Sequence, residues 1–169
     1  STRKRFIWLF LNLITAILAS IVISFFDASI EKMVALAILM PIVASMGGNA
    51  GTQTLTLTIR SLATKELISS NRKKIFNKEI SISALNGIIF AFITAISAYI
   101  WFNDLGLSLI VGLAIIVNIF SAGIFGFIIP YSLNWLKIDP AIASSVFVTT
   151  VTDVIGFLSF LGLASIFLI

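Results

Sequence analysis

The sequence predicts an all-α integral membrane protein whose chain crosses the bilayer as five helices. Of its 169 residues, 59% are hydrophobic and 11% are charged, whereas a soluble domain has about 45–50% apolar and about 25% charged residues. The mean hydropathy is +1.14. Apolar stretches also reach the length of about 20 residues that a helix needs to cross the hydrocarbon core. We therefore expect a single transmembrane domain over residues 1–169.

The predicted spans are separated by short polar connections. They are Phe6–Phe26, Met33–Ile59, Ile80–Phe102, Leu105–Leu136 and Ala141–Ile169. The first four contain no charged residue, and the fifth contains only Asp153. A transmembrane barrel would show segments of about 10 residues with alternating polarity, which these stretches lack.

The basic residues predict the orientation. Five crossings put the termini on opposite sides, so the amino-terminal tail shares a side with the second and fourth connections. That side carries every Lys and Arg except Lys32, and the positive-inside rule makes it cytoplasmic. We expect a multi-pass protein of the cell (inner) membrane, with the carboxyl terminus outside. The pI of about 9.7 reflects this topology and contact with anionic lipid, so we expect no nucleic-acid partner.

The second span contains residues that disfavour a regular helix. Pro41 removes a backbone donor, which predicts a kink. Gly47, Gly48 and Gly51 each weaken a helix by roughly 1 kcal/mol relative to Ala. We expect a helix kinked or broken at Pro41 and at the glycines, with this segment in the bundle interior, where protein or a water-filled cavity covers open backbone. Helix packing is the alternative, because Gly47 and Gly51 have the four-residue spacing of close helix contacts.

A polar stripe follows in the same span. It consists of Asn49, Gln53, Thr56 and Arg60. Steps of four, three and four residues place these side chains on one helix face. We interpret the stripe, together with Gly48, as the wall of an aqueous route. Hydrogen bonds between helices, worth about 0.6–2 kcal/mol each, are the alternative explanation.

Asp153 is the only acid in the middle of a span. An aspartate at the bilayer centre costs at least about 2.5–3.5 kcal/mol, so we interpret it as functional. The alternative is a protonated Asp held by a neighbouring Thr or Asn. Thr149 and Thr150 lie within about 60° of it around the helix, and we expect both, with Ser145, to line a pore.

Asp139 lies near the same helix face, about 21 Å closer to the cytoplasm than Asp153. We expect it to provide a second carboxylate at the inner mouth of the pore. Because Asp139 precedes Pro140, the pair is also typical of an N-cap followed by the first helical residue, and capping is the alternative role.

The carboxylate, hydroxyl, amide and backbone carbonyl oxygens of these segments suit Mg²⁺, Mn²⁺ or Ca²⁺ as ligands. The chain has no Cys and no His, which excludes thiolate or imidazole sites and the corresponding nucleophiles. A protease with paired aspartates is disfavoured because only Asp153 lies in mid-span, and we expect no enzyme.

A two-fold dimer would supply two Asp153 carboxylates, one from each copy, and would match the charge of a divalent cation. Since Mg²⁺ loses water reluctantly, we expect Asp153 to hold a hydrated ion through its waters.

The segment Pro41–Arg60, PIVASMGGNAGTQTLTLTIR, is the most specific of several that resemble the transmembrane domain of the MgtE family of magnesium channels. The others are Asn86-Gly87, Asn118, Ala122, Gly126, Pro130, Asp139–Ala141 and Thr149–Asp153. The pair Ser145-Val146 departs from the family, whose members often carry Gly-Pro there.

The resemblance implies a homodimeric Mg²⁺-selective channel lined by the second and fifth helices of both subunits. It implies that Asp153 binds the pore Mg²⁺ and that regulatory Mg²⁺ near Asp139 helps to hold the channel closed. It also implies cytosolic regulatory domains in the full-length protein, outside these residues. Coupled exchange of Mg²⁺ for Na⁺ or H⁺, ascribed to some eukaryotic relatives, is the alternative to passive permeation.

Overall fold

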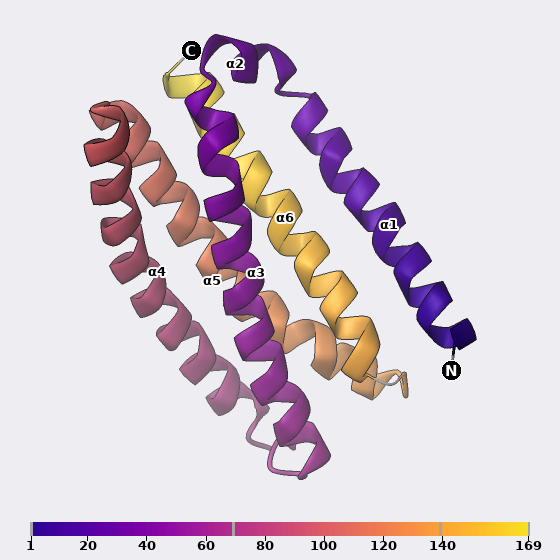
Figure 1. Cartoon of the computed structure of the whole chain (residues 1–169). Helices are drawn as coiled ribbons and strands as arrows, with labels where there is room; N and C mark the ends of the chain where they lie inside the picture. Colours follow the sequence, from indigo (N-terminus) through magenta and orange to yellow (C-terminus); the bar gives the residue numbers. More distant parts are fainter. Residues whose placement is uncertain (1, 69, 139, 169) are drawn as a thin grey trace.

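The computed structural model describes residues 2–68, 70–138 and 140–168, and these form six helices (Figure 1). They are α1 (Thr2–Ser24), α2 (Asp27–Lys32), α3 (Ala35–Ala63), α4 (Arg72–Phe102), α5 (Leu105–Trp135) and α6 (Pro140–Phe167). No strand occurs among the described residues. All except α2 are long and apolar enough to cross a membrane. The predicted all-α class is confirmed for the described residues, with five helices that are long and apolar enough to span a membrane.

The helices extend beyond the apolar stretches at their polar ends. α4 begins at Arg72 rather than at Ile80, and α3 continues past Ile59 to Ala63. Hydropathy detects the part of a helix that lies in hydrocarbon, whereas the hydrogen-bonded backbone continues into the headgroup region. The short helix α2 lies in the first connection, where the sequence predicts only a polar loop.

α3 is one continuous helix through Pro41 and the glycines. The expected break at Gly47–Gly51 is therefore wrong, and the physical reason is packing. A Cβ on Gly47 would overlap the side-chain amide of Asn118, and a Cβ on Gly51 would lie 2.6 Å from Val148 Cγ1. These glycines let α5 and α6 approach α3 closely, as the packing alternative predicts. A kink at Pro41 or at the glycines stays a prediction.

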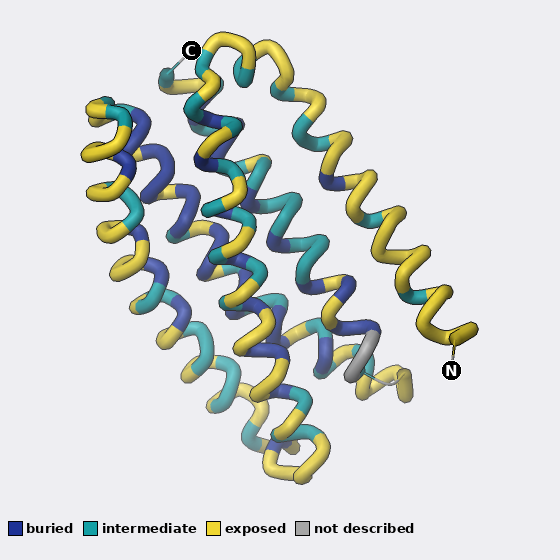
Figure 2. Tube along the Cα trace, viewed as in Figure 1, coloured by how far each residue is buried: buried dark blue, intermediate teal, exposed yellow. Residues whose placement is uncertain are grey.

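α5 is the central helix of the bundle. It packs against α3, α4 and α6, while α1 packs against α6. Figure 2 shows burial concentrated along α5, whereas α1 is largely exposed and has Ala19 as its buried residue. Val111 and Ile115 of α5 are fully buried. The remaining apolar faces of α1 and α4 are suited to contact lipid.

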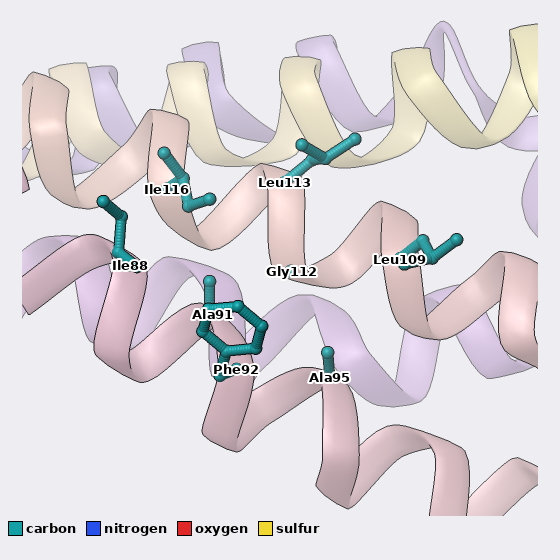
Figure 3. A pocket seen from close by; sticks show the side chains of 8 residues that line it. All are labelled: Ile88, Ala91, Phe92, Ala95, Leu109, Gly112, Leu113 and Ile116. Carbon is teal, nitrogen blue, oxygen red and sulfur yellow. The ribbon is translucent and has the colours of Figure 1, made fainter.

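Small residues bring α4 and α5 together. Ala91 and Ala95 of α4 face Gly112 of α5 (Figure 3), where a Cβ would lie 3.4 Å from the Ala91 carbonyl oxygen. Beside this contact lies an apolar groove of about 300 Å³, with walls that include Phe92 and Leu113. The turn after α4 closes through left-handed Asn103, at φ 52°.

The two chain termini lie at opposite ends of the bundle (Figure 1). The α3–α4 and α5–α6 connections lie at the amino-terminal end, and α2 lies at the other end with the carboxyl terminus. All Lys and Arg residues except Lys32 therefore gather toward one end of the bundle.

Candidate functional site

Asn118 joins three helices near the middle of the bundle. Its side chain is fully buried on α5, and its Nδ2 donates a hydrogen bond to the Val43 carbonyl of α3 at 2.9 Å. Gly47 of α3 and Gly156 of α6 lie against the same amide, since a Cβ on Gly156 would lie 2.7 Å from Asn118 Nδ2. The Oδ1 atom has no hydrogen-bond partner among the described residues. Asn118 thus positions α3 against α6.

This packing brings the middle of α3 to the middle of α6. Gly51 lies against Thr152, because a Cβ on Gly51 would be 3.6 Å from Thr152 Cγ2. Thr152 directly precedes Asp153, and Asn49 precedes Gly51 by two positions. Gly47 of α3 and Gly156 of α6 both lie at Asn118, so α3 and α6 run antiparallel. Asn49 and Asp153 therefore lie at the same level of the bundle.

The polar stripe of α3 lies outside the bundle of the single chain. Asn49, Gln53 and Thr56 are exposed, whereas Gly47 and Gly51 on the other side of α3 are buried. The expectation that the whole segment lies in the bundle interior therefore holds only for the glycine face. The polar face is uncovered because α5 and α6 both pack against the glycines. At membrane depth such amide and hydroxyl groups need water or another protein surface, because lipid tails offer no hydrogen bonds.

Two further hydroxyl residues widen this face. Ser45 and Thr52 are exposed beside the predicted stripe. Asn49 Nδ2 donates to Ser45 Oγ at 3.4 Å, and Thr52 Oγ1 donates to the Gly48 carbonyl at 2.9 Å. Neither residue was among the predicted pore-lining residues, although the four-residue step from Ser45 to Asn49 is a signal for Ser45.

Gly48 differs from its neighbouring glycines. A Cβ at this position would meet no atom within 4 Å. Packing within the chain therefore does not require a glycine there, and the half-buried backbone at Gly48 is open to an approaching group.

The candidate residues of α6 form a partly open strip. Ser145 is exposed, and Thr149 and Thr150 are half-buried. The Thr149 hydroxyl donates to the Ser145 carbonyl at 2.8 Å and the Thr150 hydroxyl to the Val146 carbonyl at 2.7 Å. A hydroxyl that donates to its own helix keeps lone pairs for its surroundings. These oxygens can therefore accept hydrogen bonds from the water shell of a cation.

Asp153 is half-buried on the same helix. Among the described residues, no Thr or Asn forms a hydrogen bond with its carboxyl group in either direction, and no Lys or Arg pairs with it. No contact among the described residues therefore supports the alternative of a protonated Asp153 held by a neighbouring Thr or Asn. The Asp153 carboxyl oxygens thus take part in no hydrogen bond or ion pair with the residues that the structure describes.

The second predicted acid, Asp139, lies outside the described residues. Within residues 2–68, 70–138 and 140–168, no group of three or more acidic side chains lies close enough to hold a metal ion. In the middle of the bundle, the described residues of a single chain therefore provide one carboxylate, that of Asp153, as a candidate cation ligand. Hydroxyl, amide and carbonyl oxygens accompany it.

The chain is similar to known transport proteins over most of its length. Residues 40–163 match the model of the MgtE family, described as divalent cation transporter. The chain is 33% identical over 165 residues to the magnesium transporter MgtE of Bacillus subtilis, covering 98% of this chain and 37% of that protein. It is also 33% identical over 161 residues to the magnesium transporter MgtE of Thermus thermophilus, covering 95% and 36% respectively. The chain thus spans 36–37% of the length of these curated relatives.

Proposed function

Because the chain belongs to the MgtE family of divalent cation transporters, we propose that it moves Mg²⁺ across a membrane through a pore shared by two copies. In each copy, α3 and α6 line the pore, and Asp153 binds the ion at its centre. The relatives carry the name magnesium transporter, which favours transport over an enzymatic function.

The exposed polar face of α3 is the observation that carries this proposal. Asn49 and Gln53 are uncovered by the chain's own helices at membrane depth, where lipid leaves them without partners. Asn49 also lies level with Asp153 on the adjacent helix, as the Gly51–Thr152 contact requires. A second copy facing this surface would enclose a path lined by polar oxygens.

The charge of the ion supports two-fold symmetry. A single carboxylate leaves a divalent cation half-neutralised, whereas a two-fold axis beside α6 supplies a matched pair from identical residues. Since Mg²⁺ keeps its water shell, the ion is held through hydrogen bonds from that shell to Asp153. The oxygens of Thr149, Thr150 and Gly48 accept further hydrogen bonds from it, and Mn²⁺ or Ca²⁺ substitutes where its hydrated size permits.

The remaining parts of the proposal concern the two mouths of the pore. Asp139 binds Mg²⁺ at the inner mouth, and Ser145 lies between it and the threonines. The basic end of the bundle lies in the cytoplasm, in accordance with the positive-inside rule. Cytosolic domains elsewhere in the full-length protein regulate the pore.

Flux into liposomes tests the transport mechanism. The full-length protein is reconstituted around a Mg²⁺-sensitive dye, with equal Na⁺ and pH on both sides, and an inside-negative potential is imposed. We expect Mg²⁺ entry, since 100 mV contributes about 4.6 kcal/mol per divalent ion. Entry that requires an opposing Na⁺ or H⁺ gradient would identify an exchanger instead. No entry under either condition contradicts Mg²⁺ transport.

Cysteine labelling tests the orientation. The 169 residues contain no Cys, so an introduced thiol is the only one within them, and the protein without an introduced thiol serves as the background control. Glu31 in α2 and Glu66 after α3 are both exposed and lie at opposite ends of the bundle. We expect a membrane-impermeant maleimide to label Glu31→Cys on intact cells and Glu66→Cys only after permeabilisation. The reverse pattern would invert the proposed topology.

A further inference from the structure

A cavity separate from the pore-lining residues lies where α4 begins and α5 ends. Its volume is about 330 Å³, and it is lined by Arg72, Tyr131, Ser132, Trp135 and Leu136. α4 and α5 pack against each other along their length, while α6 contacts the other side of the bundle through α3, α5 and α1. The cavity therefore belongs to the α4–α5 edge of the molecule.

The lining of this cavity combines hydrogen-bond donors with apolar side chains. The Arg72 guanidinium and the Ser132 hydroxyl are hydrogen-bond donors, and Trp135 and Leu136 are exposed apolar groups. Among the described residues, no carboxylate forms an ion pair with Arg72. The charge of Arg72 is therefore available to an anion that also carries an apolar portion.

The surroundings of the cavity add positive charge. Lys73, Lys74 and Lys78 follow Arg72 on α4, and all three are exposed. A cluster of this kind next to a membrane helix attracts anionic lipids, and basic pockets between such helices bind their headgroups. Charge complementarity thus favours an anionic occupant over a neutral one.

The cavity also lies where the membrane surface is expected. Arg72 begins α4 and Leu136 follows the end of α5, and both helices are long and apolar enough to cross a membrane. Tyr and Trp are the residues that favour the membrane–water interface. The Tyr131 ring stacks on Phe127 at a centroid distance of 5.8 Å, and Phe127 packs on Phe76 of α4 at 5.1 Å. This aromatic row holds one wall of the cavity in place.

We propose that this cavity binds the headgroup of an anionic phospholipid. The Arg72 guanidinium donates hydrogen bonds to the phosphate oxygens, with Ser132 as a second donor, because a planar guanidinium suits two oxygens of one phosphate. Trp135 and Leu136 contact the glycerol and the first acyl carbons. This apolar wall selects a lipid over free phosphate. The groove in Figure 3, lined only by apolar residues, lacks the donors that would recognise a headgroup.

Native mass spectrometry of the delipidated full-length protein tests the proposal. It is titrated with phosphatidylglycerol, with phosphatidylcholine and with soluble glycerol phosphate. We expect phosphatidylglycerol to bind most tightly, and Arg72→Gln to weaken its binding by about tenfold or more. Lys73→Gln removes the same charge from a neighbouring residue outside the cavity lining, and we expect a loss of less than about threefold for it.

Two results would overturn the proposal. Equal losses for Arg72→Gln and Lys73→Gln would indicate diffuse attraction to a basic surface instead of a site. Glycerol phosphate that competes as well as the lipid would indicate a phosphate site without lipid selectivity. Thermal unfolding of both variants controls for folding, and Trp135→Ala offers an independent variant. We expect it to weaken phosphatidylglycerol binding while leaving Arg72 in place.

Discussion

Asp153→Asn is expected to reduce potential-driven Mg²⁺ flux by about a hundredfold or more, because it removes both carboxylates from the centre of the proposed dimeric pore. The amide has a similar size, so the packing of α6 is preserved while the charge that balances the ion is lost. The liposome flux assay measures the effect directly. Flux equal to that of the unmodified protein would exclude Asp153 as the ion site.

A matched variant on the same helix controls for general damage to α6. Ser159 is half-buried and donates its hydroxyl to the Gly156 carbonyl at 3.2 Å, so Ser159→Ala also removes one polar group. Ser159 lies about 120° around the helix from Asp153. We expect the flux of this variant to stay within about twofold of the unmodified protein, since the exchange removes only a local hydrogen bond. A comparable loss in both variants would point to helix distortion as the cause.

Mixed dimers distinguish a shared site from two separate ones. When equal amounts of unmodified and Asp153→Asn protein assemble at random, about a quarter of the two-fold dimers contain two carboxylates. If transport needs both Asp153 carboxylates of a dimer, the mixture should give about a quarter of the flux of the same amount of unmodified protein. Independent pores predict one half, and that result would contradict a site on the dimer axis.

Gly47→Ala is expected to destabilise the bundle, although Ala is the better helix former. The new Cβ would overlap the Asn118 amide, which is fully buried and bonded to Val43 and so cannot move aside freely. Overpacking typically costs about 1–3 kcal/mol, which exceeds the gain of at most about 1 kcal/mol in helix propensity. We expect a lower unfolding temperature in detergent and a reduced Mg²⁺ flux.

Gly48→Ala is the matched control for stability. It makes the same change one residue later, where a Cβ meets no atom within 4 Å. We expect its unfolding temperature to be unchanged or raised. Equal unfolding temperatures for Gly47→Ala and Gly48→Ala would contradict the packing role of Gly47.

A double variant tests the same contact from the other side. Asn118→Ala removes the side-chain amide that the new methyl group of Gly47→Ala would overlap. We therefore expect the variant with both substitutions to lose less stability than the sum of the losses in the two single variants.

Much of the architecture was predictable from local sequence properties. The five spans follow from the length of the apolar stretches, and the gathering of basic residues at one end follows from their places in alternate connections. The resemblance of Pro41–Arg60 to the MgtE family is confirmed by the family match over residues 40–163. The roles of Asp153 and Asp139 stay predictions.

The glycines of α3 show where local properties are insufficient. Gly47, Gly48 and Gly51 have the same intrinsic effect on a helix, so the sequence alone does not distinguish a break from a close contact. The tertiary structure decides the matter, because Asn118 lies against Gly47 and Val148 against Gly51, whereas Gly48 faces open space.

The sequence by itself determined that this chain has five stretches long and apolar enough to cross a membrane, where its charges gather, and which polar residues share a face of α3. Each of these properties depends on neighbours along the chain. Only the tertiary structure decided that α3 is continuous, that its glycine face is buried and that its polar face is left uncovered beside Asp153. The reason is that helix periodicity defines faces but not partners. Which face a neighbouring helix covers depends on contacts such as Asn118–Val43, between residues far apart in the sequence.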